Sequence, residues 1–594
     1  MANKLYTQLP WTGGLNTSLD ESQIPGNQLT VADNVQFDTR GSRKKRDGIN
    51  HAYDSVAITG VSVANPSIIT AAGHGLTSGD TVVISGTATT PTILGSRVAT
   101  VINADTFSIP VNVTATTDVV GSFYSNPARN IIGMFDYWYG TGASRTQKLV
   151  AVTSDGKVFS YNSSGVRTAI VVTANYTTTP ITKCTMTTIG NILIIAVDGA
   201  NNVMKYWDGS AAVENVPTTS GVAPPLASIV STHQGRIVCN AKDAPDRLFY
   251  SPVEDYTRWG GIGDSGAIDI AVGDGDPIGI NAIFPTFKGD LFVAKKTKLY
   301  RITGYSPETL QVIKVSDGIG CVSHNSITAI DQDDIFFVSE RGVHSLAATD
   351  QFGDFSSTYV SVDIQKTFND DFNRSRLQYV HGEYLSNINC VAFTFSLEAS
   401  TANDQLYLYH IPTKAWHRYT TVSCQSLVVS NDSDKRRFYI GTSSGRVSKT
   451  LAGTSYDVDN TGTNSAIQYN VTTGIIYLNE NQYEFNALKR FVIYYKPVGA
   501  HSVTCEVRCD NLELNSENSL TFINASSVDL LGTTFILGSS ILGSTAIMQP
   551  HSRMIDGRCR AFKLAISQSG VQQEVEIQGF AIEFEPLGYS ESES

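Results

Sequence analysis

The chain has 594 residues, with 43 Lys and Arg against 55 Asp and Glu, and a formal net charge of −12. This length exceeds one compact core and predicts several domains, and the acidic balance excludes a general electrostatic affinity for nucleic acid. Charged residues make up only 16% and there are 49 glycines, which is typical of a β-rich protein with many turns. The sequence contains no run of about 18 apolar residues, and its first residues lack the apolar core of a signal peptide. We therefore expect that the protein is synthesised in the cytoplasm and that it does not insert stably into a membrane.

Residues 1–56 form a glycine-rich segment that we expect to be an extended arm packed on the next domain, where it could supply an outer strand. Glycines and an Ile-Pro step favour extended, turn-rich backbone. The basic cluster Arg43–Arg46 could contact phosphate, act as a localisation-like patch or form a solvated turn, and the acidic chain favours the turn. The distinctive segments are Trp11–Thr17, Ile24–Gln28, Ala32–Val35 and Gly41–Gly48.

Residues 57–125 predict a separate inserted module. Short alternating apolar runs are separated by Gly-His-Gly and Ser-Gly-Asp turns, a pattern that indicates a small β-barrel. His74 lies between two glycines, and no second ligand type is spaced to join it in a metal site. We interpret it as a turn histidine.

Residues 126–454 repeat one local pattern seven times: an apolar run, a turn and a second run carrying aromatic residues. The copies recur at intervals of roughly 44–59 residues, near the roughly 40–50 residues of a four-stranded propeller blade. A β-propeller with seven blades is therefore predicted, with six as the alternative because the longest interval could hide an irregular blade. The copies are Leu149–Phe159, Ile192–Trp207, Arg236–Tyr250, Leu291–Ile302, Ile335–Ser345, Cys390–Tyr409 and Arg437–Lys449.

One helix is predicted, between the fifth and sixth copies. Ile364, Phe368 and Phe372 recur every four residues within Ser361–Arg374, with Ser361 as a candidate N-cap. We expect the helix to cover an edge of the ring or to contact a neighbouring subunit. The aromatic turns at Tyr250–Trp259 and Tyr409–Tyr419 could stack on sugars, but packing between blades is favoured.

Residues 455–588 predict a C-terminal antiparallel β-sandwich, since good strand patterns are separated by long polar connections. The apolar segment Leu530–Gly543 either packs in the core or meets a partner. Residues 589–594 form an acidic tail that we expect to be disordered. The overall fold class is all-β.

Signals for enzyme chemistry are weak, and we expect no enzyme and no cofactor. Gly441–Gly445 matches Gly-x-Ser-x-Gly, but a strand pattern follows it where a nucleophile elbow needs a helix. Asp274–Asp276 and Asp331–Asp334 could supply metal oxygens or a carboxylate pair, although both lie in turns where Asp stabilises the backbone. The eight cysteines lie mostly in apolar runs, so buried thiols are favoured over disulfides.

The order Gly-Gly-Leu-Asn, Ile-Pro, Asn-Val and Gly-x-x-x-x-Arg-x-Gly, ahead of a propeller and a C-terminal β domain, resembles the tail nozzle proteins of short-tailed bacteriophages. These proteins are also called tail tubular protein B or tail hub proteins. The His-Gly-Leu-x-x-Gly-Asp pattern of the inserted module resembles a small β module of phage tail and fibre proteins. The residues expected to dock the arm on the propeller are Gly13, Gly14, Leu15, Asn34, Gly41, Arg46 and Gly48.

The resemblance implies a structural virion protein, located in the tail after assembly in the host cytoplasm. It implies a homohexameric ring below the portal and adaptor proteins that also contacts tail fibres or spikes. Double-stranded genomic DNA would be retained in this channel and ejected through it without sequence specificity. An acidic lumen would repel the DNA phosphates, and only residues lining the bore would matter, because the Debye length is about 8 Å. The acidic candidates for the channel or its mouth are Asp331, Asp333, Asp334, Asp370 and Asp371.

Two alternatives come from other functional classes. A carbohydrate-binding or carbohydrate-cleaving propeller at the tail tip would need clustered acidic and aromatic residues at the mouth of the propeller axis. A generic scaffold propeller that binds host proteins would be a monomer absent from virions.

Overall fold

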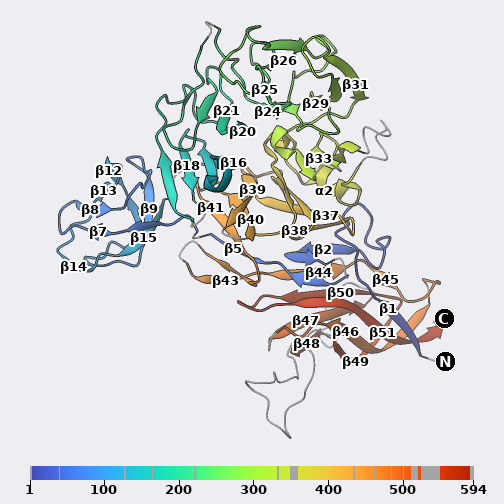
Figure 1. The fold of residues 1–594 in the computed structure, drawn as a ribbon. Helices are drawn as coiled ribbons and strands as arrows, with labels where there is room; N and C mark the ends of the chain where they lie inside the picture. The colour runs from blue at the N-terminus through green and yellow to red at the C-terminus, as the bar shows by residue number, and fades with distance from the viewer. Residues whose placement is uncertain are drawn as a thin grey trace.

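The computed structural model describes residues 3–38, 41–51, 53–125, 129–162, 165–219, 222–330, 334–347, 359–432, 435–459, 462–482, 484–498, 501–509, 519–523 and 549–588. Figure 1 shows a ring of sheets, a small lobe at its side and a sandwich beneath it. The predicted packing segment at 530–543, the tail at 589–594, Asp331 and Asp333 lie outside the described residues.

Seven antiparallel sheets form the ring, and we number them as blades 1–7 in chain order. Blades 1 and 2 contain β16 (Ile131–Tyr139), β17 (Thr146–Thr153), β18 (Val158–Tyr161), β19 (Arg167–Ile170), β20 (Cys184–Ile189), β21 (Ile192–Val197), β22 (Lys205–Trp207) and β23 (Glu214–Asn215). Blades 3 and 4 contain β24 (Val230–His233), β25 (Arg236–Cys239), β26 (Arg247–Tyr250), β27 (Gly266–Asp269), β28 (Ala282–Ile283), β29 (Leu291–Ala294), β30 (Lys298–Thr303) and β31 (Gln311–Asp317).

The last three blades close the ring. They contain β32 (Thr328–Ile330), β33 (Asp334–Val338), β34 (Val343–Ser345), β35 (Gly382–Leu385), β36 (Cys390–Phe395), β37 (Gln405–His410), β38 (Ala415–Tyr419), β39 (Ser426–Asp432), β40 (Lys435–Gly441) and β41 (Val447–Leu451). The outermost strand of blade 7 comes from the arm, because β5 (Gly48–Asn50) pairs antiparallel with β41. Since β39 also contacts β16, the propeller is closed and has seven blades, not six.

Apolar clusters fill the spaces between neighbouring blades. Val150 and Val152 of blade 1 pack with Leu193 and Ile195 of blade 2 in one such cluster. Trp259 packs with Ile194 and Ile237 in another, so this aromatic turn serves the contact between blades 2 and 3. Middle strands are covered on both faces, which is why they read as continuous apolar runs.

Between blades 5 and 6, the described residues 359–381 contain three short helices: η3 (Val362–Ile364), α2 (Gln365–Asp370) and η4 (Arg374–Tyr379). The predicted apolar face is buried, and the Phe372 ring stacks on Phe395 with centroids 4.3 Å apart. Ser361 stands at the N-cap position of η3, as predicted, but its side chain makes no cap hydrogen bond. Its hydroxyl instead accepts the Val343 amide at 3.1 Å, which ties the helical segment to blade 5.

The inserted module has a separate apolar core that includes Ile58, Phe107 and Phe123. Two four-stranded sheets and one two-stranded sheet enclose this core as a small barrel. The strands are β6 (Val56–Ile58), β7 (Gly60–Val61), β8 (Ser67–Thr70), β9 (Thr81–Ser85), β10 (Ala88–Thr90), β11 (Gly95–Val98), β12 (Thr100–Asn103), β13 (Thr106–Ile109), β14 (Ala115–Asp118) and β15 (Gly121–Ser125).

The C-terminal sandwich packs two sheets face to face, and the arm supplies strands to both. One sheet orders its strands β3-β4-β51-β46-β49 with β1 beside β51, and the other runs β2-β44-β50-β47-β48 with β45 beside β50. The strands are β1 (Lys4–Gln8), β2 (Leu29–Asp33), β3 (Val35–Phe37), β4 (Arg43–Lys45), β44 (Tyr469–Thr473), β45 (Ile476–Tyr477), β46 (Phe485–Tyr495), β47 (Ser502–Cys509), β48 (Ser519–Ile523), β49 (Gln549–Cys559), β50 (Ala561–Gln568) and β51 (Glu576–Gly588).

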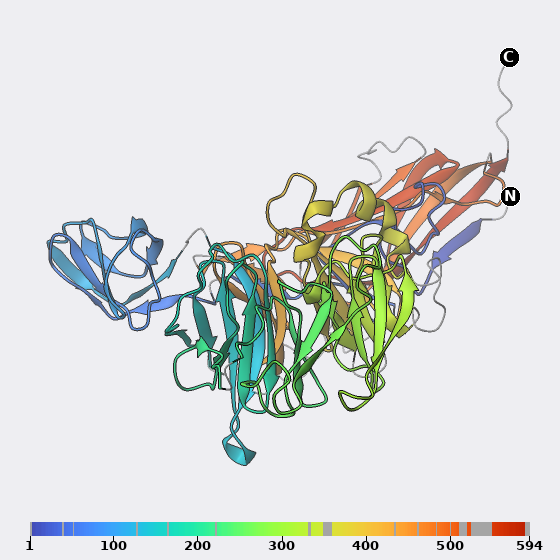
Figure 2. The same cartoon turned by 90° about the horizontal axis from the view of Figure 1, so that it is seen from above.

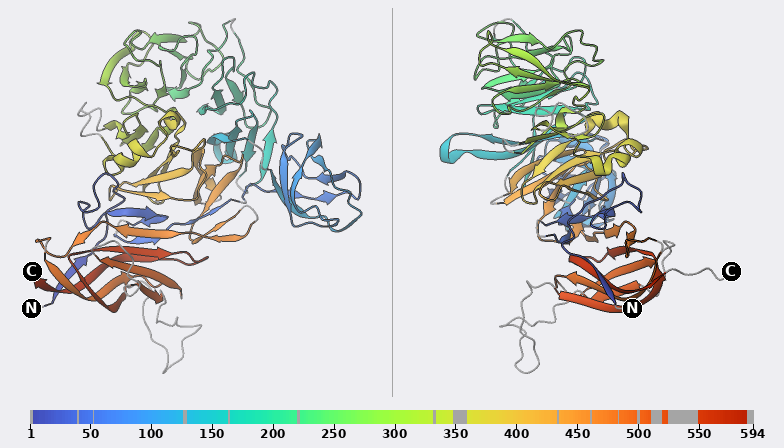
Figure 3. Two further views of the ribbon diagram at one scale, coloured as in Figure 1. Left: turned by 180° about the vertical axis from the view of Figure 1, so that it is seen from behind. Right: turned by 90° about the vertical axis from the view of Figure 1, so that its right-hand side faces the viewer.

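The structure differs from the predicted division in two respects. β42 (Tyr456–Val458) and β43 (Asn464–Ala466) extend the sheet of blade 7, because β42 pairs with β5. In addition, β2 lies between β38 of blade 6 and β44 of the sandwich, so one continuous sheet crosses from the propeller into the sandwich. Figure 3 shows the arm strands at this boundary. Residues 1–56 therefore form part of both domains, whereas we predicted an arm laid on the propeller.

Candidate functional site

The glycines of the N-terminal motif lie where the arm meets other backbone. A Cβ on Gly13 would be 2.3 Å from the Asn27 carbonyl oxygen, and one on Gly14 would be 2.5 Å from the Trp416 nitrogen in blade 6. A Cβ on Gly48 would be 1.8 Å from the Tyr456 carbonyl oxygen. These positions need glycine because the backbones approach too closely for a side chain.

Gly41 and Leu15 make the remaining backbone contacts of the motif. Gly41 has φ +85°, and a Cβ there would be 2.4 Å from Cβ of Pro10. The Leu15 amide donates to the Trp416 carbonyl at 2.7 Å, and the Leu15 side chain is buried. Leu15 therefore holds the arm against blade 6, whereas Gly41 allows a close contact within the arm itself.

Asn34 connects three parts of the chain through one side chain. Its Nδ2 donates to Thr420 Oγ1 at 2.8 Å, at the end of blade 6, and to the Gln468 carbonyl at 2.6 Å, just before β44. Its Oδ1 accepts from Arg46 Nε at 2.8 Å. The backbone has φ 56°, a left-handed conformation that Asn tolerates better than most residues.

Arg46 forms a buried, two-pronged ion pair with Asp457 of β42. Both hydrogen bonds are 2.8 Å long, and the two side chains are 0% and 8% exposed. The same carboxylate accepts the amide of Ile49 in β5 at 2.8 Å. The pair therefore fixes the arm strand that closes the propeller.

The predicted solvated turn at Arg43–Arg46 is wrong, because Arg43, Lys45 and Arg46 are buried. The Arg43 guanidinium lies 3.8 Å from the Trp11 ring centroid and donates to the carbonyls of Trp11 and Gly13. Lys45 Nζ donates to Gln568 Oε1 at 2.6 Å, and burial lowers its pKa to about 8. Pairing of β4 with β3 and β51 places these side chains inside, so they are not available to phosphate.

The three described acidic channel candidates do not form one site. Asp334 opens β33, accepts the Ile335 and Ala347 amides at 2.7 and 3.0 Å, and accepts the Ser345 hydroxyl at 2.6 Å. It therefore stabilises its own blade. Asp370 and Asp371 are exposed at the end of α2.

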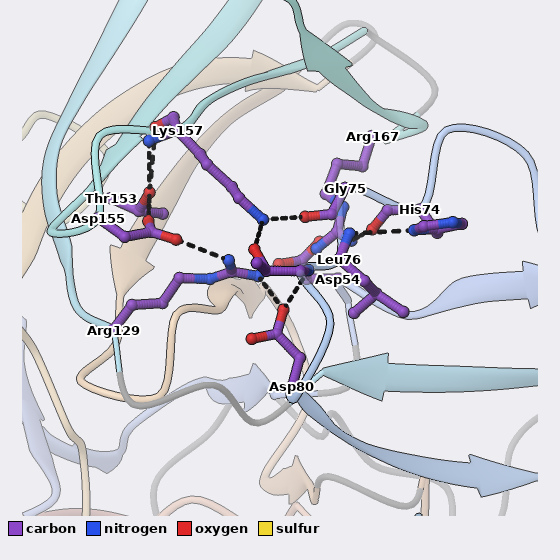
Figure 4. A network of polar contacts seen from close by, with 11 residues as sticks. Asp54, His74, Gly75, Leu76, Asp80, Arg129, Thr153, Asp155, Lys157 and Arg167 are labelled. Carbon is purple, nitrogen blue, oxygen red and sulfur yellow. Dashed lines mark hydrogen bonds and ion pairs between the residues drawn. The ribbon is translucent and has the colours of Figure 1, made fainter. Parts of the chain in front are cut away.

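A buried polar network docks the inserted module on blade 1 (Figure 4). Arg129 lies between Asp80 of the module at 3.5 Å and Asp155 of blade 1 at 2.9 Å. Lys157 reaches across to the Gly75 carbonyl at 2.7 Å, and Arg167 donates to the His74 carbonyl at 2.9 Å. Charges on both sides are satisfied across the boundary, so the module is held in one orientation.

His74 is a buried structural histidine of this docking loop. Its Nε2 lies 2.9 Å from the Asn103 carbonyl, and its Nδ1 accepts the Leu76 amide at 3.0 Å. Burial lowers its pKa below the ordinary value. The ring thus shapes the turn that carries Gly75 to Lys157.

Cavities gather at one mouth of the propeller axis, where the innermost strands begin. Two of them have empty volumes of about 710 and 810 Å³, are open to solvent, and share Lys183 and Asn325. A third adjoins the first through Asn281 and Gln378. The helix η4 lies on this face, whereas the tip of the β16–β17 hairpin projects from the opposite face (Figure 2).

The residues that line this mouth share one position in the blades. The residue directly before the innermost strand lines it in six blades: Asn130, Lys183, Ile229, Asn281, His381 and Gln425. Lys242 comes from the turn after β25, and Arg376 and Tyr379 come from η4. These residues can be identified only when the first residue of each innermost strand is known. The repeated hairpin pattern in the sequence does not show where those strands begin.

The other chemical candidates serve local structure. Gly441–Gly445 joins β40 to β41 as a hairpin turn, as predicted. Burial alone would raise the pKa of Asp274, but hydrogen bonds from Tyr300, the Asp276 amide and Lys295 hold it at about 2. Asp276 accepts the Thr297 amide at 2.8 Å. These two carboxylates stabilise blade 4.

Six cysteines are buried thiols: Cys184, Cys239, Cys321, Cys390, Cys424 and Cys505. Burial raises the pKa of the Cys321 thiol to about 12. Within the described ranges, no group of three or more His, Cys, Asp and Glu is placed to hold a metal ion. None of the helices in the described part of the chain has the length and apolar character needed to span a bilayer.

The chain was compared with family models, curated proteins and solved structures. No family model matches the chain, and no curated protein matches it. Among solved structures, it is similar to YCF48 from Cyanidioschyzon merolae, at 12% identity and a TM-score of 0.32. The match covers 54% of this chain and 98% of that one. The fold described above follows from the strand pairings themselves.

Proposed function

We propose that this protein is a structural subunit of the tail nozzle, or hub, of a short-tailed bacteriophage. Its role is mechanical: copies form a homohexameric ring around a channel in which double-stranded DNA is retained and from which it is ejected. Portal and adaptor proteins contact one end, and tail fibres or spikes bind the outside. The protein is made in the host cytoplasm and resides in the virion tail, and we assign no catalytic residue to it.

The observation that carries this proposal is the junction built by the N-terminal motif. The residues on which the resemblance rests are the ones that join the arm to blade 6, blade 7 and the sandwich, through Gly14, Asn34 and Arg46. Close backbone approach and a buried ion pair explain why these residue types stand in this order. A continuous sheet from β35 to β48 then makes the propeller and the sandwich one stiff body, which suits a part that resists pressure from packaged DNA.

The carbohydrate alternative gains no support from the mouth of the propeller. Among the described lining residues of its three cavities, the one carboxylate is Glu340, and the one Phe, Tyr or Trp ring is Tyr379. Glu340 is paired with Lys296 at 2.6 Å. Stacking platforms and a carboxylate pair, which a glycosidase needs, are absent from this lining.

Quantitative mass spectrometry of purified phage particles tests the proposal. We expect about one copy of this chain for every two portal subunits, since a sixfold ring stacks on a twelvefold one. Absence from particles, or a count in multiples of fibre trimers, would overturn it. A purified chain that stays monomeric when mixed with portal and adaptor proteins would also count against the ring.

A further inference from the structure

The mouth of the propeller axis concentrates positive charge in an acidic protein. Lys183, Lys242 and Arg376 line adjoining cavities in a chain whose net charge is −12. Elsewhere in the ring, the buried Lys295 has Asp246 at 2.6 Å as a carboxylate partner, whereas the buried Lys205 donates to the Ala174 carbonyl and to Asn215 Oδ1. Among the described residues, Lys183, Lys242 and Arg376 form no ion pair, although the charge of Asp198 acts on both lysines and that of Asp404 acts on Arg376, in each case partly offsetting the effect of burial on the pKa.

Contacts hold these three cationic side chains in place, and some of their N–H groups have no hydrogen-bond acceptor among the described residues. Arg376 uses Nε to bind Ser396 Oγ at 3.0 Å and lies 4.9 Å from the Tyr379 ring centroid, so both terminal NH2 groups remain open. Lys183 Nζ lies 5.6 Å from the same centroid. Lys242 Nζ donates to the carbonyls of Val197 and Gly199, which leaves one of its three protons.

Neutral donors complete the lining. Asn325 Nδ2 lies 3.2 Å from both the Cys184 carbonyl and His381 Nε2, and this fixes the side chain at the meeting point of the two larger cavities. Gln378 is exposed and shared by all three cavities. Partial burial of the cations has a cost that an anion would offset, since burial lowers the pKa of Lys183 and of Arg376.

We propose that this mouth is a binding site for a small phosphate-bearing ligand, held by Lys183, Lys242 and Arg376. Three cations match a multiply charged oxyanion, and the fork of a guanidinium fits two phosphate oxygens. The ligand is therefore a free phosphate compound or a phosphorylated sugar. This site does not depend on the role proposed for the ring.

Isothermal titration of the full-length protein with inorganic pyrophosphate tests the site. We expect saturable binding by the wild type at up to about 1 mM, weakened by added salt. Lys183→Met and Arg376→Met should each weaken it at least about tenfold, because each removes a charge-assisted contact. Arg376→Lys, which keeps the charge, should lose less. Lys314→Met is the matched control, because it removes an exposed cation that is paired with Asp317 on β31, outside the cavities, and it should bind like wild type.

Glucose 1-phosphate in a parallel titration distinguishes the two sources. Tighter binding than pyrophosphate assigns the site to a phosphorylated sugar, and weaker binding assigns it to a free phosphate compound. Circular dichroism of each variant ensures that a loss of binding does not reflect unfolding. The proposal is overturned if the wild type binds neither probe, or if folded Lys183→Met and Arg376→Met bind both as tightly as Lys314→Met does.

Discussion

Arg46 holds Asp457 by two parallel hydrogen bonds of 2.8 Å, although the two residues lie more than 400 positions apart in the chain. The pair is buried beside β5, the arm strand that completes blade 7. Ring closure therefore depends on a charge pair shielded from water. Breaking such a pair leaves an uncompensated buried charge, which typically costs about 3–5 kcal/mol.

Asp457→Ala should release β5 from the propeller. The Ile49 amide, which donates to the same carboxylate, should exchange with solvent about 100-fold faster or more, in line with that cost. Hydrogen exchange over residues 48–51, followed by mass spectrometry, measures this change in the amide exchange rate. Asp269→Ala is the control, since its pair with Arg247 is about half exposed and should contribute little to stability. Equal exchange in both variants would mean that backbone pairing alone holds β5.

Gly48→Ala should also disrupt ring closure, by a different mechanism. The new methyl group would lie 1.8 Å from the Tyr456 carbonyl oxygen, so β5 and β42 must move apart. We expect a loss of about 3 kcal/mol or more, at the upper end of overpacking effects, seen as a lower thermal midpoint. In Gly60→Ala the nearest atom is Thr70 Oγ1 at 3.2 Å, and the midpoint should change little. A Gly48→Ala protein as stable as Gly60→Ala would show that the approach is looser than described.

Acid should destabilise the protein through two buried histidines. Burial lowers the pKa of His344 to about 4 and of His417 to about 3, from an ordinary value of 6.5. Below about pH 6.5 the unfolded chain binds protons that the folded chain excludes, so stability falls as the pH drops toward 4, by up to about 1.4 kcal/mol per pH unit and group. Thermal midpoints from pH 7.5 to 4.5 would show this slope.

The variant His417→Phe isolates one of these groups. Neither ring nitrogen of His417 has a hydrogen-bond partner among the described residues, so an aromatic ring without nitrogen keeps the packing. The acid slope should become shallower, while stability at pH 7.5 is retained. An unchanged slope in His417→Phe would assign the acid sensitivity to other groups.

Arg129→Met should loosen the inserted module without unfolding it. The guanidinium joins Asp80 to Asp155, and its loss leaves two carboxylates facing each other at the docking surface. Spin labels at Ser96→Cys in the module and Lys314→Cys in blade 4 should give a broader distance distribution. Arg145→Met, at the exposed hairpin tip, should leave the distribution narrow. A narrow distribution in Arg129→Met would show that Lys157 and Arg167 hold the module without it.

Much of the fold could be predicted because the strands of the blades have a pattern that is recognisable in the local sequence. β21 and β36 are covered on both faces by neighbouring blades, so each is an apolar run followed by a turn. The inserted module could also be predicted from local sequence, since its turns are short and rich in glycine. These signals are local, and seven of them at a regular interval define a ring.

The pairing of the arm could not be predicted, because its partners are distant in sequence. A single pair, Asp33 with Arg418, joins β2 to blade 6. Nothing local distinguishes Arg43 under Trp11 from an arginine in a solvated turn until β4 is known to pair with β51. The cationic mouth was missed for a related reason: its residues come from different blades and meet only when the ring closes.

The arm also sets the order in which the molecule can be completed. Lys4 pairs with Phe584, and Ile49 pairs with Thr450. The arm strands are therefore synthesised long before the strands with which they pair. At roughly 5–20 residues per second, that interval lasts tens of seconds or more. A chain that lacked β51 would lack the strand that pairs with β1 and one of the two strands that pair with β4. Without β51, the sheet of the sandwich that contains β1, β4 and β46 therefore cannot be completed.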